Sequence, residues 1–342
     1  MKTVTDNTKL RLMKSKLPGL YDLKKIWNPS WFQGNLKKSR YFEGWYFKIA
    51  SENSKHTWAF IPGVSLADGD DHSFVQAING KTGQSWYFRY PLDAFSYSEK
   101  GFGVWVGNSY FSAEEIHLQL RDDNSLFSGR VEFANRVSFL AGLRKPGIMG
   151  WYRYVPFMEC YHGVVSLDHK LQGELQINNQ KFLFNNGRGY IEKDWGRSMP
   201  KAWIWMQSNH FDIPGTSLML SVARIPWLGS SFTGFLGFLL HKGKRYDFAT
   251  YTGAKLTILE NSDEKLVILI KGKDFLLELI TGASRTGSLK APVSGNMHRV
   301  IHESIDASIR IKLSDRTGQV IYEGTGQNAG FEKVGDQRLL SH

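Results

Sequence analysis

The sequence is poor in cysteine and has no long apolar run. Its 342 residues include a single cysteine, Cys160. Disulfide frameworks and cysteine-built zinc sites are therefore excluded, and Cys160 is expected to be a small buried apolar residue. The longest stretch without charge or histidine, residues 225–240, has 16 residues. A membrane-spanning helix needs roughly 20 apolar residues, so this stretch does not predict one.

Positive charge is concentrated at the N-terminus. Of the formal net charge of +11, residues 1–40 contribute +8 through ten basic and two acidic residues. This distribution argues against a nucleic-acid surface on the body, so no nucleic-acid partner is expected. We expect residues 1–39 to form a basic aromatic arm that binds an anionic membrane surface. Deletion of residues 1–38 should then weaken sedimentation with anionic liposomes while the body stays folded. The alternative is a solvated tail that folds over the body.

The N-terminus also lacks the apolar core of a signal peptide. We therefore expect a cytoplasmic protein, peripheral to the membrane if the arm binds there. Residues 225–240 contain several large apolar side chains and are an alternative docking element, although a buried strand is the simpler interpretation of that segment.

From residue 41 onward, short alternations of apolar and polar residues dominate, for example at 116–121, 127–133, 218–222 and 305–311. Such alternation predicts half-buried strands. Turn-forming residues such as Asn79-Gly80 and those at 185–187 separate the strands. The pattern predicts an all-β fold of the sandwich or barrel type.

A weak internal similarity suggests how the strands are divided. The motif at Tyr41–Trp45 returns, with one insertion, 149 positions later at Tyr190–Trp195. Two tandem β-domains, residues 40–165 and 166–342, would account for this spacing. Chance similarity between two aromatic strands is the alternative.

Aromatic and polar side chains are densest in residues 189–211. Trp203, Trp205 and Gln207 alternate with apolar residues, so one face of a strand carries two indoles and an amide. Glu192 and Asp194 precede this strand. Carboxyl groups among aromatic rings have raised pKa values unless they are paired, so a poised acid is one interpretation. A structural aromatic cluster with exposed turn carboxylates is the other.

Other familiar sites are missing. There is no glycine-rich phosphate loop between a strand and a helix, and no nucleophile elbow. His298 and His302 are four residues apart beside Glu303, but no third metal ligand is evident. No metal and no cofactor are therefore expected. A further segment, residues 149–169, adds Glu159 and His162 among aromatic residues.

Three motifs together resemble the tocopherol cyclase family. They are Tyr41–Phe47 (YFEGWYF), residues 157–163 (FMECYHG), and residues 192–196 (EKDWG) followed by the PKxWxWxQxN pattern of residues 200–209. The resemblance implies two tandem lipocalin-like antiparallel β-barrels or half-barrels behind the basic arm. It also implies a cofactor-free reaction, in which an acid protonates the alkene of a prenylated phenol or quinol and the phenol oxygen closes a chromanol ring.

The resemblance also suggests site residues. Glu192 is the first candidate for the acid, because Asp194 stands where the plant-type pattern often has Asn. Glu43, at the corresponding place of the first motif, is next, followed by Glu159 and by His162 as a base. Each carboxylate has a structural brace as its alternative. The expected substrate-binding residues, for which core packing is the alternative, are Trp45, Tyr46, Tyr190, Trp195, Trp203, Trp205, Gln207 and Asn209.

Two other functions remain open on the sequence. A lipid- or isoprenoid-binding protein would have the pocket without catalysis. A hydratase would capture the cation with water instead of the internal phenol. The site can change while the barrel persists, so the resemblance alone does not decide among the three.

Overall fold

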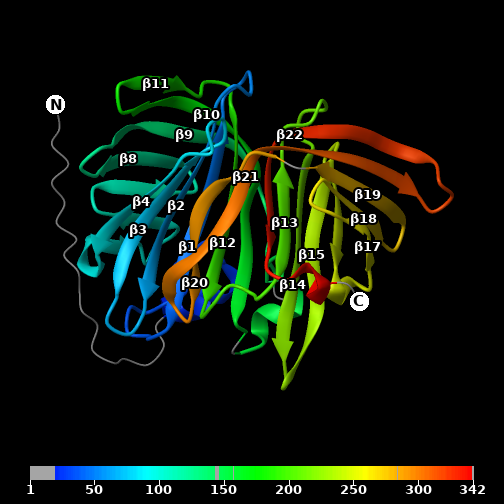
Figure 1. The fold of residues 1–342 in the computed structure, drawn as a ribbon, viewed down its shortest axis with the longest axis horizontal. Coiled ribbons are helices and arrows are strands. Elements are labelled where there is room, and N and C mark those ends of the chain that lie inside the picture. The colour runs from blue at the N-terminus through cyan, green and yellow to red at the C-terminus, as the bar shows by residue number, and fades with distance from the viewer. Residues whose placement is uncertain (1–19, 143–145, 157, 283, 341–342) are drawn as a thin grey trace.

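The computed structural model describes residues 20–142, 146–156, 158–282 and 284–340. This part of the chain consists almost entirely of antiparallel strands in two sheets that lie side by side (Figure 1). The all-β, two-barrel prediction is confirmed. The described chain contains no helix of the length and apolarity that a bilayer crossing requires.

The first sheet has twelve strands. In spatial order they are β4 (Ser85–Pro91), β3 (His72–Asn79), β2 (Thr57–Leu66), β1 (Tyr41–Ala50), β12 (Arg188–Gly196), β10 (Cys160–Ile177), β9 (Leu126–Ser138), β8 (Glu115–Arg121), β7 (Ser109–Ser112), β6 (Gly103–Val106) and β5 (Phe95–Tyr97), with β11 (Gln180–Leu183) paired to β10.

The second sheet has ten strands. Its order is β16 (Lys244–Ala249), β15 (Ser230–His241), β14 (Ser217–Trp227), β13 (Trp203–Ser208), β22 (Val320–Val334), β21 (Asn296–Asp315), β19 (Phe275–Gly282), β18 (Lys265–Lys271) and β17 (Lys255–Asn261), with β20 (Gly287–Val293) paired to β21. The helical turns are α1 (Leu20–Lys24), η1 (Lys25–Trp27), η2 (Leu92–Ala94), η3 (Gly150–Tyr154), η4 (Thr250–Thr252) and η5 (Gln337–Leu340).

The two sheets repeat one topology. The order β4-β3-β2-β1-β12-β10 of the first corresponds to β16-β15-β14-β13-β22-β21 of the second. The two similar sequence motifs are not this repeat, because they lie on β1 and β12, which pair with each other and place Tyr46 opposite Glu192. The resemblance between the motifs is therefore one between neighbouring strands of a single sheet.

The change of sheet comes later in the chain than the sequence suggested. The boundary expected between residues 165 and 166 falls inside β10, and both β10 and β12 belong to the first sheet. The second sheet begins with Trp203, after the end of β12 at Gly196. The first barrel therefore needs the strands that follow residue 165 to complete its sheet.

Alternation along the strands builds three apolar clusters. One fills the first barrel with residues such as Trp45 and Phe47, and a second fills the other barrel around Ile204 and Met206. The third contains residues of both sheets, among them Tyr46, Trp203 and Trp205, and lies between the barrels. The space between the barrels, and not a barrel interior, is therefore where the strands leave room for a site.

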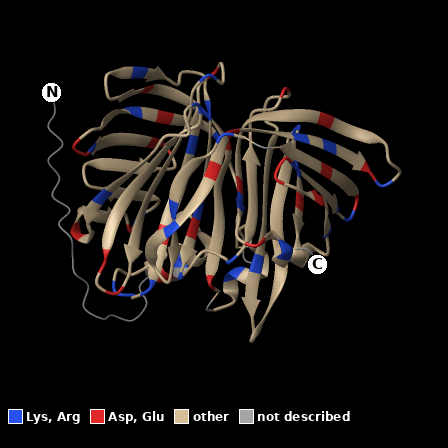
Figure 2. Cartoon of the chain, in the orientation of Figure 1, with Lys and Arg blue, Asp and Glu red and all other residues tan. Residues whose placement is uncertain are grey.

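The described end of the N-terminal arm closes the first barrel. Phe32 is buried in the barrel's core, and the backbone N–H groups of Gln33 and Gly34 donate to Glu43. Lys193 in turn donates to the carbonyl oxygens of Pro29 and Trp31. Deleting residues 1–38 would open this end of the barrel, so the expectation that the body stays folded after that deletion conflicts with the structure. On the body, basic and acidic residues are interspersed over both sheets (Figure 2).

Candidate active site

A cavity of about 180 Å³ lies between the two sheets. Its walls come from both barrels: β1, β2, β3, β10 and β12 of the first, and β13, β14, β15, β20, β21 and β22 of the second. Most lining residues are apolar. The ionisable side chains that line it are Tyr46, Glu159, Cys160, His162, Glu192, Asp194, Lys290, Glu303 and Glu332.

The strand alternation explains which predicted residues face this cavity. On β12, Glu192 and Asp194 line the cavity, whereas Lys193 points into the first barrel, where it pairs with Glu43. On β13, Trp203 and Trp205 line the cavity, and the alternate residues pack inside the second barrel. The face predicted for β13 is confirmed.

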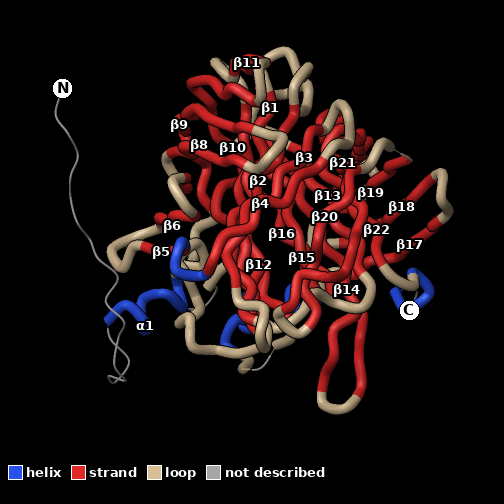
Figure 3. The backbone as a smooth tube through the Cα atoms, turned by 60° about the vertical axis from the view of Figure 1, so that its left-hand side comes forward, coloured by secondary structure: helices blue, strands red, loops and turns tan. Residues whose placement is uncertain are grey.

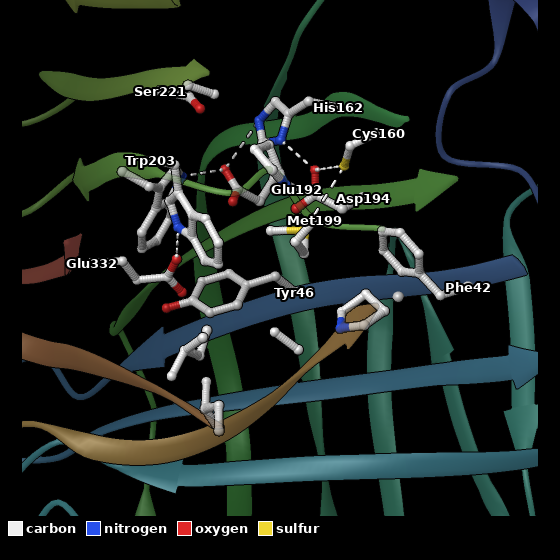
Figure 4. Close-up of a pocket in the computed structure, with 18 of the residues that line it drawn as sticks. Phe42, Tyr46, Cys160, His162, Glu192, Asp194, Met199, Trp203, Ser221 and Glu332 are labelled. Carbon is white, nitrogen blue, oxygen red and sulfur yellow. Dashed lines mark hydrogen bonds and ion pairs between the residues drawn. The ribbon is translucent and has the colours of Figure 1, made fainter. Parts of the chain in front are cut away.

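At one end of the cavity, His162 lies between two carboxylates (Figure 4). Its Nδ1 is 2.9 Å from Asp194 Oδ1, and its Nε2 is 3.5 Å from Glu192 Oε2. Burial by itself would lower the pKa of His162, but the two carboxylates outweigh burial and raise the pKa to about 10. His162 is therefore an imidazolium at neutral pH, not the free base that the sequence suggested.

Glu192 is held by neutral donors in addition to His162. The Tyr190 hydroxyl donates to Glu192 Oε2 over 2.7 Å, and Trp205 Nε1 lies 3.3 Å from the same oxygen. One carboxylate oxygen of Glu192 thus faces a hydroxyl donor, an indole donor and the imidazolium of His162. Glu192 is therefore arranged as the partner of a cation, which suits a base better than an acid.

A second carboxyl pair, which no sequence motif predicted, lines the same cavity. Glu303 and Glu332 are directly opposite each other on β21 and β22 and both line the cavity. Glu303 Oε1 accepts a hydrogen bond from the Tyr46 hydroxyl, and Glu332 accepts one from Trp203 Nε1. Glu303 is completely buried, and its Oε2 has no hydrogen-bond partner among the described residues.

Burial controls the protonation of this pair. It raises the pKa of Glu303 well above its usual range, and the neighbouring Glu332 adds to the effect. Burial also raises the pKa of Glu332, to about 7, although the Trp203 N–H opposes the shift. Two adjacent carboxyl groups in apolar surroundings cannot both ionise, so the pair retains a proton at neutral pH.

A sequence signal for Glu303 existed. The apolar alternation noted at residues 305–311 extends back to Ile301, and Glu303 then occupies one of the apolar positions. An ionisable residue on a buried face is informative, because burying it costs free energy. For Glu332, the polar and glycine-rich β22 gives no comparable pattern.

Glu43 lies elsewhere, inside the first barrel. It is completely buried, forms an ion pair with Lys193 and accepts hydrogen bonds from Tyr41 and from the backbone of Gln33 and Gly34. It does not line the cavity. Glu43 is thus a brace that joins the arm to the barrel, which was the stated alternative to its acid role.

The other predicted residues divide between cavity and core. Tyr46 and Glu159 line the cavity, and burial raises the pKa of Glu159. Trp45 and Trp195 pack in the core of the first barrel and lie over Lys193. Three more are buried without lining the cavity: Tyr190, Gln207 and Asn209.

One group could in principle hold a metal ion. Ligand atoms of His162, Glu192 and Asp194 all lie within 4.8 Å of one another. A metal would have to replace the proton of His162 and break both of its ion pairs. The geometry thus suits a proton between two carboxylates at least as well as it suits a cation.

Comparison with known proteins identifies the family. Residues 119–335 match the tocopherol cyclase-like family model, which is more than half of the chain. This protein belongs to the tocopherol cyclase-like family. The matched range includes the cavity residues His162, Glu192, Asp194, Glu303 and Glu332.

Curated relatives are distant. The chain is 24% identical over 268 residues to a probable chloroplastic tocopherol cyclase of *Oryza sativa* subsp. *japonica*, covering 62% of this chain and 57% of the rice protein. It is 22% identical to the chloroplastic tocopherol cyclase of *Zea mays*, covering 86% of this chain and 75% of the maize protein. The chain thus spans little more than half of the rice protein.

Among solved structures, the crystal structure of CghA resembles this one with a TM-score of 0.55 at 9% identity. The similarity covers 86% of this chain and 89% of CghA. The similarity supports the tandem lipocalin-like fold of the protein described here. At this identity it carries no information on the reaction.

Proposed function

We propose that this protein closes a chromanol ring on a prenylated phenol or quinol by acid catalysis in the cavity between the barrels. The observation that carries the proposal is the proton-retaining pair Glu303–Glu332 at an apolar cavity. Protonation of an alkene needs a strong acid shielded from water, and a neutral carboxyl group with an apolar wall meets that need. Glu303 Oε2, which has no other hydrogen-bond partner among the described residues, supplies the position for the proton.

The proposed step conserves atoms and charge. The carboxyl proton forms a C–H bond with the alkene, and the tertiary carbocation that results is captured by the phenol oxygen. The phenol proton passes to a base, so substrate and product are isomers. The indoles of Trp203 and Trp205 line the cavity and would stabilise the cation through their ring faces.

Another carboxyl group of the same cavity supplies the base. Glu192, held by Tyr190 and Trp205 and backed by the His162 imidazolium, would take the phenol proton. Asp194, on the other side of His162, keeps the imidazolium in place. Acid and base are thus different carboxyl groups of one cavity, so one can give a proton to the alkene while the other takes the phenol proton.

The substrate tail has a second space. A cavity of about 60 Å³ shares Met149, Met158, Ser221, Ala223, Ile225 and Leu236 with the first. Apart from Gly234 and Thr250, its remaining walls are aromatic: Tyr152, Phe232, Phe235 and Tyr251. We assign the prenyl tail to this extension.

A lipid surface is the proposed source of the substrate. The β14–β15 hairpin projects from the body (Figure 3), and Leu228 at its tip is 91% exposed. Trp227 and Phe232 of the hairpin pack around Tyr152, and the adjacent Trp151 is 48% exposed. Trp27 at the end of the basic arm donates a hydrogen bond to the Tyr154 hydroxyl. The aromatic residues of the hairpin and of η3 thus lie on the same side of the molecule as the arm. This arrangement suits an anionic bilayer.

Incubation in heavy water tests the proposed reaction. Purified protein with a methylated prenyl hydroquinone in D₂O should give a product that co-migrates with a chromanol standard and carries one carbon-bound deuterium. A product heavier by one water, formed in ordinary water, would support the hydratase instead. Tight binding with no product across several tail lengths and ring methylations would support the lipid-binding protein and contradict the cyclase.

A further inference from the structure

A buried lysine lies directly behind the cavity wall. Lys48 on β1 is completely buried, and its Nζ donates to the carbonyl oxygens of Asn328 over 2.7 Å and of Gln207 over 3.4 Å. No carboxylate among the described residues lies within ion-pair distance of this ammonium group. A buried ammonium without a counter-ion is costly, so its presence calls for an explanation beyond packing.

Lys48 is adjacent to the acid pair. Tyr46, two residues earlier on the same face of β1, donates to Glu303, and Glu332 lies four residues beyond Asn328 on β22. The region between Lys48 and the acid pair is tightly packed, because a Cβ on Gly330 would lie 2.4 Å from the Trp205 ring and 3.5 Å from the Tyr46 hydroxyl oxygen. Tyr46 and Lys48 themselves stand one strand repeat apart on the same face of β1.

Unpartnered polar atoms surround this position. Both side-chain polar atoms of Gln207, Nδ2 of Asn328 and Oε2 of Glu303 are buried and have no hydrogen-bond partner among the described residues. Gln207 and Glu303 are completely buried, and Asn328 is 3% exposed. A buried polar atom that gives up water without gaining a partner destabilises the fold. We call Lys48, Gln207, Asn328 and Glu303 the inter-barrel polar layer.

Charged groups face Lys48 from several strands. Glu303 on β21 and Glu192 on β12 favour the ammonium, whereas burial lowers the pKa of Lys48 to about 7 and has the largest effect. His210, after β13, feels the charge of Lys48 and of Arg188 on β12, and burial lowers its pKa. The Tyr190 phenol is on the residue opposite Lys48 in the β1–β12 register, the Tyr46 phenol is two residues away on β1, and Glu332 is on β22, whose Asn328 carbonyl accepts from Lys48.

We propose that Lys48 is a positioning residue whose ammonium, through the inter-barrel polar layer, stabilises the carboxylate that the Glu303–Glu332 pair becomes after it gives up its proton. The role rests on the proposed function, since it concerns the same acid. Without such a cation, the new charge would have only the Tyr46 hydroxyl and the Trp203 N–H to stabilise it. An acid whose conjugate base is stabilised in place donates its proton more readily.

Infrared titration of the full chain tests this role without a substrate. The carbonyl band of a protonated carboxyl group, assigned by its loss in Glu303→Gln, is followed against pH in the wild type and in Lys48→Met. Removing the ammonium should raise the titration midpoint by about one pH unit or more, a tenfold change in proton affinity. Lys81→Met, which removes an exposed lysine that pairs with Asp306, should leave the midpoint unchanged.

The outcomes are distinct. An unchanged midpoint in Lys48→Met would overturn the role of Lys48 and leave the proposed acid intact. A wild type without any protonated carboxyl band would overturn the acid pair itself, and the role of Lys48 with it. If Lys48→Met does not fold, Lys48→Gln supplies the same charge removal with a polar side chain, and Lys48→Arg should restore the wild-type midpoint.

Discussion

Glu43 and Glu303 are both completely buried carboxyl groups, but they lie in opposite surroundings. Glu43, inside the first barrel, is paired with Lys193 and with backbone N–H groups of the arm. Glu303, between the barrels, has a tyrosine hydroxyl, a second carboxyl group and an apolar cavity. The comparison shows that burial alone does not make an acid, because a lysine in contact turns a buried carboxyl group into a structural brace.

The largest effect is expected on turnover. Glu303→Gln should lower chromanol formation by about 10²–10⁴-fold, the usual contribution of a general acid, while binding of a non-reactive substrate analogue is retained. Glu43→Gln, measured per folded molecule, should keep turnover near that of the wild type. Full activity of Glu303→Gln together with loss of activity in Glu192→Gln would move the acid role to Glu192.

For stability, we expect the larger effect from the change at Glu43 and the smaller one from the change at Glu303. Glu43→Gln leaves the Lys193 ammonium buried without its partner, so we expect a loss of about 3–5 kcal/mol in the free energy of unfolding. Glu303→Gln replaces a largely neutral carboxyl group by an amide of similar shape and should change stability much less. Urea unfolding of both variants measures the difference. Equal losses would contradict the distinction between brace and acid.

The pH dependence of stability reports on His162. Its pKa rises from about 6.5 in the unfolded chain to about 10 in the fold. The stabilisation is complete below the unfolded value and is lost between pH 6.5 and 10, at no more than about 1.4 kcal/mol per pH unit. Subtracting the profile of His162→Asn isolates this contribution, and a difference that stays constant over that window would show that His162 is neutral in the fold.

Lipid binding should give the smallest effect. Leu228→Asn removes an exposed apolar side chain at the hairpin tip, and we expect a several-fold weaker sedimentation with anionic liposomes at unchanged stability. Removing residues 1–19, which leaves the barrel-closing residues in place, should weaken the sedimentation with liposomes further. Leu259→Asn, at another exposed position, is the matched control. Equal binding by all variants would exclude both elements as the docking surface.

The strands could be predicted from the sequence because apolar and polar residues alternate along a half-exposed strand. This alternation predicted the all-β fold and the face of Trp203 and Trp205. It could not show which strands pair, since pairing depends on contacts far apart in the chain. For that reason the motifs on β1 and β12 were interpreted as a repeat, although they are neighbours in one sheet.

For the same reason, only half of the site could be predicted from the sequence. Glu192, Asp194 and His162 lie within recognisable motifs, and the structure brings them together at one end of the cavity. Glu303 and Glu332 come from strands without such motifs and meet only through the β21–β22 register. Glu43 and Glu192 occupy similar motifs in the sequence. The alternation of side chains between the two faces is shifted by one residue between these motifs, so Glu43 lies on the opposite face of the sheet from Glu192.

The most direct test of the account is a crystal structure with a non-reactive prenyl hydroquinone analogue. We expect the ring and first prenyl unit between the barrels, with the carbon that accepts the proton within about 3.5 Å of a carboxyl oxygen of Glu303 or Glu332. The phenol oxygen should lie towards Glu192 and His162. An analogue bound inside either barrel, or with its alkene away from both carboxyl groups, would contradict the assignment of the acid.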